Sequence, residues 1–278
     1  MTPTALPKAR LTPTAIAPDT FLIHDHQADV AAPVFIPLNS MVIRGAEPVV
    51  VDTGEAANRE RWFEDVFSLV EPEDVRWLFI SHDDADHTGN LHELMERCPN
   101  ATLVVNWFMV ERMGGGLKIP STRWRWVSDG ESLDVGDRVL QAVRPPVFDA
   151  PTTRGLFDPR TGVYWGSDSF GTPMLAPVPD VSEFEPDFWF EGIATISHYV
   201  SPWLALTDEG RWQATVDRVA ALDPTVLVGC HTPAVVGRER VAQAIEATRR
   251  TPATAVAAQP DQAVLDELNR VLGQSAAA

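Results

Sequence analysis

Ser81-His82-Asp83-Asp84-Ala85-Asp86-His87-Thr88-Gly89-Asn90 is the stretch that decides the fold. It holds two imidazoles and three carboxylates within six residues, directly after the apolar segment 75–80, which is typical of a buried strand. Alternate residues of an extended segment point the same way, so His82, Asp84 and Asp86 can face one point. A solvated acidic turn would explain the carboxylates but not the two histidines. Because the carboxylates repel one another without a cation, the stretch predicts a metal site.

The segments around this stretch alternate between strand and helix patterns. After His87 we expect a helix with a buried stripe at Leu91, Leu94 and Met95. Strands are expected at 21–23, 41–43, 48–51 and 102–106, and a helix at 56–70. The alternation predicts an α/β fold.

The middle of the chain is less regular. Gly114-Gly115-Gly116 ends any helix that begins at Trp107, and Arg123-Trp124-Arg125-Trp126 alternates basic and aromatic residues. This alternation fits either a mobile flap over a pocket or an edge strand with one buried tryptophan face, and we favour the edge strand. A strand is expected at 138–143.

Three later polar residues follow predicted strands. Asp149 comes after the strand that ends at 143, Asp168 after the apolar segment 163–165, and His231 after the segment 226–230. Ligands of α/β proteins gather at the carboxyl ends of strands. We therefore expect these three side chains to lie beside the cluster at 82–87.

The domain organisation is predicted from composition. Residues 1–20 are expected to be an extended arm, 21–250 one metal-binding domain, and 251–278 an Ala-Thr-Pro linker with a final helix. That helix is expected at 261–272 with Gly273 as its C-cap, docked on the domain or on a partner subunit of a homodimer. Two supporting helices are expected at 208–222 and 238–249.

Charge and cysteine content exclude several functions. A formal net charge of −17 argues against nucleic acid or an anionic membrane as partner. The two cysteines, Cys98 and Cys230, are too few for a disulfide framework and look too isolated for a thiolate metal site, which favours a reducing compartment. We see no signal peptide and no membrane span, so a cytoplasmic location is expected.

The order and spacing of Val51-Asp52-Thr53-Gly54, the cluster, Asp168 and His231 resemble the metallo-β-lactamase superfamily over about residues 21–233. The usual motif of that superfamily is His-x-His-x-Asp-His, whereas this chain has Asp84 at the middle position and Asp149 where a later histidine is usual. An acid at the middle position is similar to the flavodiiron proteins and their oxygen-binding diiron relatives, whose motif is His-x-Glu-x-Asp-His. The resemblance implies an αββα sandwich of two mixed β-sheets flanked by helices.

The resemblance also implies a dinuclear site. We expect Asp52 to steady the loops that bear the metals rather than to bind metal. The ligand sets that the resemblance implies are His82, Asp84 and Asp149 for the first metal, Asp86, His87 and His231 for the second, and Asp168 between them. Four carboxylates balance two divalent cations, and the oxygen-rich first set suits iron or manganese better than zinc.

Three functions remain open on the sequence. The first is a diiron protein that binds, and reduces, dioxygen or nitric oxide with electrons from a separate donor protein. The second is a hydrolase whose bridging hydroxide attacks an ester, lactone or phosphodiester, and the third is a non-catalytic oxygen sensor. His198, beside Tyr199, is a candidate proton donor in the pocket or a packed core histidine. FMN is not expected, because no hydroxyl-rich phosphate loop follows His231.

Overall fold

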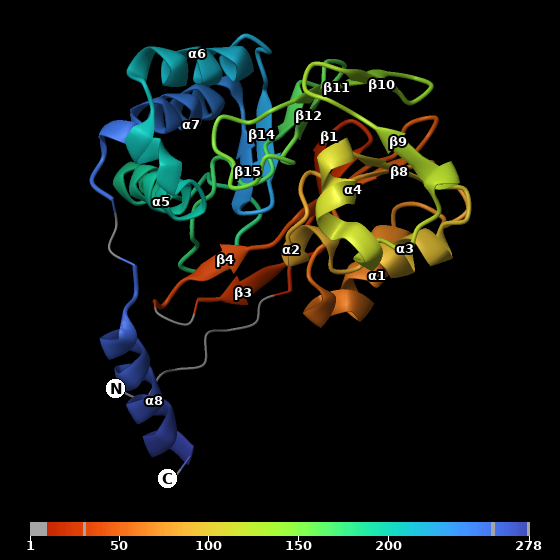
Figure 1. The fold of residues 1–278 in the computed structure, drawn as a ribbon. Coiled ribbons are helices and arrows are strands. Elements are labelled where there is room, and N and C mark those ends of the chain that lie inside the picture. Colours follow the sequence, from red (N-terminus) through yellow and green to blue (C-terminus); the bar gives the residue numbers. More distant parts are fainter. Residues whose placement is uncertain (1–9, 30–31, 257–258, 277–278) are drawn as a thin grey trace.

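The structure is a computed structural model that describes residues 10–29, 32–256 and 259–276. Two β-sheets pack face to face, and helices cover the outer face of each sheet (Figure 1). The predicted αββα sandwich is confirmed.

The first sheet has seven strands. The first four pair antiparallel, and the fourth of them also begins a parallel set with the remaining three. Its order is β1 (Thr14–Ala17), β2 (Thr20–Ile23), β5 (Ser40–Ile43), β6 (Val49–Val51), β7 (Trp77–Phe79), β8 (Thr102–Val105) and β9 (Trp124–Trp126). The strand β9 lies at the edge of this sheet with Trp126 exposed and Trp124 packed on the core, so the edge-strand interpretation is confirmed.

The second sheet has six strands and is also mixed, because only β13 and β14 pair in parallel. Its order is β10 (Ser132–Asp134), β11 (Val139–Val143), β12 (Gly155–Asp158), β13 (Val163–Trp165), β14 (Val226–Gly229) and β15 (Thr232–Val236). A separate hairpin joins β3 (His26–Ala28) to β4 (Phe35–Pro37).

Three apolar layers hold the sandwich together. The middle layer lies between the sheets and includes Val51, Phe79 and Trp165, all fully buried. The outer layers pack helices on the sheets: α1 (Arg59–Phe67) and α3 (Leu91–Arg97) on the first, α5 (Pro186–Val200), α6 (Glu209–Ala220) and α7 (Arg238–Arg250) on the second. Leu91, Leu94 and Met95 form the buried stripe of α3 as predicted.

Several element boundaries differ from the expectation. The segment expected to be an extended arm contributes β1 from Thr14 onward, because Thr14 and Ala15 pair with β2. The helix expected at 56–70 is shorter, and α8 (Gln262–Ala276) continues through Gly273 instead of ending there. Figure 1 shows α8 projecting away from the two sheets. In the described part of the chain, no helix combines the length and apolar character that crossing a bilayer requires.

His24 couples β1 to the fold and makes stability depend on pH. Its ring Nε2 lies 2.9 Å from Thr14 Oγ1, and burial, with Arg61 and His26 nearby, lowers the pKa of His24 to about 4. The unfolded chain therefore takes up a proton below its ordinary pKa of 6.5 while the folded chain does not. The contribution of the neutral His24 to stability is therefore fully present above pH 6.5 and is lost as the pH falls toward 4.

We predict that lowering the pH from 7 to 5 reduces the free energy of unfolding by about 2 kcal/mol through His24 alone. Urea unfolding of the wild type and of His24→Gln at both pH values measures it, because groups common to both proteins cancel in the comparison. Equal losses in the two proteins would contradict this prediction.

Candidate metal centre

Strand ends from both sheets bring the predicted ligands to one place. The loop after β7 carries His82 and Asp84, and the short helix α2 (Ala85–Thr88) carries Asp86 and His87. The second sheet contributes the three remaining side chains, Asp149 after β11, Asp168 after β13 and His231 after β14. All seven predicted residues thus lie in one cluster.

The distances divide the cluster into two sets. His82 Nε2 lies 3.6 Å from Asp84 Oδ2 and 3.6 Å from Asp149 Oδ1. In the second set, Asp86 Oδ2 lies 3.3 Å from His231 Nε2 and 3.7 Å from His87 Nε2. The two groups contain the residues that the resemblance assigns to the first and the second metal.

Asp168 lies between the two sets. One of its oxygens, Oδ2, is 3.6 Å from His82 Nε2, and the other, Oδ1, is 3.0 Å from His87 Nε2 and 3.6 Å from His231 Nε2. A carboxylate with one oxygen on each side can be shared by two ions.

The three imidazoles are anchored through their Nδ1 atoms. His231 Nδ1 lies 2.9 Å from the carbonyl oxygen of Pro37, which can only accept, so this nitrogen carries the proton. His87 Nδ1 lies 2.8 Å from a carboxylate oxygen of Asp52. Both rings therefore direct Nε2 into the cluster, which is the arrangement that metal-binding histidines adopt.

Hydroxyl groups orient His82 in the same way. The Ser81 hydroxyl donates to Asp52 Oδ2 at 2.6 Å, so the Ser167 hydroxyl must donate to Ser81 Oγ, 2.9 Å away. Having used its only proton, Ser167 Oγ accepts from His82 Nδ1 at 3.2 Å. Asp52 thus connects the loop at Ser81 to His87 without itself facing the cluster.

Two of the residues that anchor the histidines have strained backbones. Asp52 and Ser167 both have left-handed backbones, with φ of +57° and +53°. A non-glycine residue pays for this conformation, and such residues concentrate at functional sites. Gly229 shows a related constraint, because a Cβ there would lie 2.4 Å from the backbone oxygen of Ser167. The end of β14 can therefore approach the Asp168 loop only with glycine at this position.

The centre of the cluster needs a proton or a cation. Among the described residues, His82 Nε2, His87 Nε2 and Asp168 Oδ1 are buried without a hydrogen-bond partner. With Nδ1 protonated, each neutral imidazole presents a lone pair toward the Asp168 carboxylate, so acceptors face acceptors. Buried groups of this kind need a proton or a metal ion between them. The residues present therefore fit a pair of metal ions.

The pKa values of the buried groups also indicate that a proton or a metal ion is needed between them. Burial acts to lower the pKa of His87, but the neighbouring Cys230 and Asp52 outweigh it and raise this pKa well above its ordinary value. Burial acts to raise the pKa of Asp168, but His82 and His87 outweigh it and lower this pKa. In the metal-free protein, protons on the imidazoles occupy the place of a cation, and a metal ion would displace them.

The cluster opens to solvent on one side. The side chains of His82, His87 and Asp168 are at most 2% exposed, whereas Asp84 is 51% and Asp149 is 27% exposed. A small molecule would therefore enter along the first ligand set.

Cys230 corrects one expectation from the sequence. Its thiol had looked too isolated for a metal site, yet its Sγ lies 3.5 Å from Asp86 Oδ2. The potential ligand atoms of Asp86, His87, Cys230 and His231 all lie within 4.8 Å of one another.

The candidate proton donor His198 and its neighbour Tyr199, a second candidate catalytic residue, lie outside the cluster. His198 is a packed histidine, because its Nε2 lies 3.1 Å from Thr251 O and 3.0 Å from Thr254 Oγ1. Tyr199 lines a pocket of about 500 Å³ beside the start of α8. Neither residue belongs to the metal-ligand groups found among the described residues.

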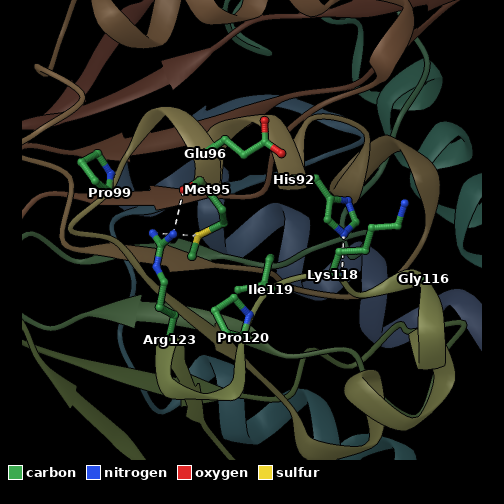
Figure 2. A pocket seen from close by; sticks show the side chains of 9 residues that line it. All are labelled: His92, Met95, Glu96, Pro99, Gly116, Lys118, Ile119, Pro120 and Arg123. Carbon is green, nitrogen blue, oxygen red and sulfur yellow. Dashed lines mark hydrogen bonds between the residues drawn. The ribbon is translucent and has the colours of Figure 1, made fainter.

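Another pocket, of about 580 Å³, lies beside α3 and contains a further histidine (Figure 2). There, His92 Nε2 accepts the Lys118 backbone N–H at 3.2 Å, and Arg123 binds the carbonyl oxygens of Met95 and Cys98. None of the seven predicted ligands lines this pocket. His92 therefore serves as a control histidine.

Comparison with known proteins reveals a family. The sequence model of the family described as "Metallo-beta-lactamase superfamily" matches residues 34–231, more than half of the chain. Among curated proteins, a putative diflavin flavoprotein A 1 of Thermosynechococcus vestitus is 33% identical over 156 residues, which are 55% of this chain and 27% of that protein. The anaerobic nitric oxide reductase flavorubredoxin of Pectobacterium atrosepticum is 25% identical over 134 residues, 48% of this chain and 26% of that protein. The chain thus covers about a quarter of the length of these relatives.

Solved structures share the fold. The rubredoxin oxygen:oxidoreductase of Desulfovibrio gigas superposes with a TM-score of 0.77 at 16% identity, covering 87% of this chain and 62% of that one. A fragment (1–254) of the putative diflavin flavoprotein A 5 of Nostoc sp. PCC 7120 superposes with a TM-score of 0.71 at 16% identity, covering 87% and 96%.

Proposed function

Since the chain belongs to the metallo-β-lactamase superfamily, we propose that it is a member of the flavodiiron branch, which holds two iron ions and reduces dioxygen or nitric oxide with electrons from a separate donor protein. The observation that carries the proposal is the set of buried atoms without partners, His82 Nε2, His87 Nε2 and Asp168 Oδ1. Two relatives named as a nitric oxide reductase and an oxygen oxidoreductase support the choice of substrate.

Side chains of this chain would position and orient the two metal ions. His82, Asp84 and Asp149 would hold the first ion, Asp86, His87 and His231 the second, and Asp168 both. Bound ferrous ions would offer open coordination positions and one electron each. The buried histidines keep the inner side closed, and the exposed Asp84 leaves the outer side open to a small gas.

Metal analysis and oxygen consumption test this proposal together. Protein purified without a nickel column should contain about two irons per chain. Reduced anaerobically and exposed to air, it should consume oxygen once and stop, because two ferrous ions supply two electrons and full reduction to water needs four. Continuous consumption should require a reduced donor such as rubredoxin.

Other outcomes would contradict the proposal. Sustained oxygen consumption without a donor would show another electron source. Reversible oxygen binding without turnover, whichever donor is supplied, would indicate a sensor. Two zinc ions with cleavage of an ester or lactone would indicate a hydrolase.

The first ligand set provides a prediction about metal choice. Changing Asp84 and Asp149 together to histidine replaces two oxygen donors with nitrogen, which should raise the ratio of zinc to iron or manganese. The ratio is measured after loading metal-free protein from an equimolar mixture. Asp84→Glu keeps an oxygen donor and should leave the ratio close to that of the wild type. An unchanged ratio in the double variant would mean that these side chains do not set metal choice.

A further inference from the structure

A thiol lies in the wall of the second metal position. Cys230 is fully buried at the end of β14, and its Sγ is 3.5 Å from Asp86 Oδ2. The ligand atoms of Asp86, His87, Cys230 and His231 lie within 4.8 Å of one another, a spacing at which four donors can surround one ion.

The surroundings support a ligand role for this thiol. His87 Nε2, which is fully buried and without a hydrogen-bond partner, directs a lone pair into the same space. The backbone of Cys230 is fixed on both sides, since its N–H donates to Ser167 O at 2.8 Å and its carbonyl accepts from Asn39 N–H at 2.9 Å. The thiol is thus held beside the second ligand set by the same loop that carries Asp168.

We propose that Cys230 is a thiolate ligand of the second metal, together with Asp86, His87 and His231. This inference rests on the proposed dinuclear site and adds a donor that the sequence motif does not contain. When the metal binds, the Sγ–metal bond replaces the S–H bond and the proton passes to solvent, with no electron transferred.

A thiolate at the second position would make the two positions prefer different metals. The first set offers two carboxylates and one imidazole, which suit hard ions, whereas sulfur favours softer ions such as zinc or cadmium. The ligands would also carry five negative charges, four from carboxylates and one from sulfur. That total matches one divalent and one trivalent ion, whereas the four carboxylates alone match two divalent ions.

Cobalt substitution tests this inference without an activity assay. Metal-free protein loaded with Co²⁺ should show a near-ultraviolet sulfur-to-cobalt charge-transfer band. Cys230→Ser and Cys230→Ala should lose the band and bind the second cobalt at least about tenfold more weakly, while retaining the first. Cys98→Ser is the matched control and should keep the band. Burial raises the pKa of Cys98 to about 12, and the metal-ligand groups found among the described residues do not include it.

The outcomes separate this inference from the proposed function. Two cobalt ions without a charge-transfer band in the wild type would overturn the thiolate ligand and leave the dinuclear site. A band that persists in both Cys230 variants would also overturn it. A chain that binds no cobalt would remove the dinuclear site and this inference with it.

Discussion

Replacing Asp168 with alanine should remove both metal ions, whereas replacing His82 or His231 with alanine should weaken only one position. The reason is that Asp168 places one oxygen toward His82 and the other toward His87 and His231. Loss of a residue that only supports a ligand typically lowers metal affinity by about tenfold to a hundredfold. Loss of the shared ligand Asp168 should lower the metal affinity of both positions by more than this. Metal content after exhaustive dialysis measures the effect.

His92→Ala is the matched control, because His92 lies in the separate pocket of Figure 2 and should leave the metal content unchanged. Circular dichroism should show that each variant is folded. Full metal content in Asp168→Ala, or equal content in all four variants, would remove the ligand assignment.

Replacing Asp52 with alanine should destabilise the protein and weaken the second metal position. Its buried carboxylate accepts the backbone N–H and hydroxyl of Ser81 at 2.6 Å each, the ring of His87 at 2.8 Å and the indole of Trp165 at 3.1 Å. Leaving these donors unpaired should lower the free energy of unfolding by about 3 to 5 kcal/mol. Without its anchor, His87 should bind metal about tenfold to a hundredfold more weakly.

Two further variants separate these effects. Trp165→Phe removes one donor to Asp52 but leaves His87 anchored, so it should reduce stability while keeping metal affinity. Asp52→Asn should not restore affinity, because its NH₂ group would face donors instead of accepting from them. Urea unfolding and metal titration measure the two quantities, and unchanged affinity in Asp52→Ala would refute the anchoring role.

The cluster was predictable because its chemistry is local. His82 to His87 directly follow a buried strand, so adjacency alone places them at one edge of the sheet. Asp149, Asp168 and His231 were predictable from the rule that ligands gather at strand ends. Cys230 follows the same rule, but no motif marks its thiol as a member of the group that contains Asp86.

The helix α5 was not predicted, and its sequence explains why. Gly192 lies in its middle, and glycine disfavours helix by about 1 kcal/mol relative to alanine. Packing requires this glycine, because a Cβ there would lie 2.1 Å from Thr172 Oγ1. Such a tertiary requirement overrides local propensity and cannot be read from the helix alone.

The anchors of the three histidines determine when the site can form during synthesis. His82 is oriented by a residue 85 positions later, and His231 by a carbonyl 194 positions earlier. Contacts this distant in sequence form late in folding, after the intervening chain has closed. A nascent chain on the ribosome therefore carries the His82 to His87 cluster long before His231 emerges to complete the second position. Metal capture at the second position should accordingly follow the emergence and folding of the segment that carries His231, and not the synthesis of the cluster at His82 to His87.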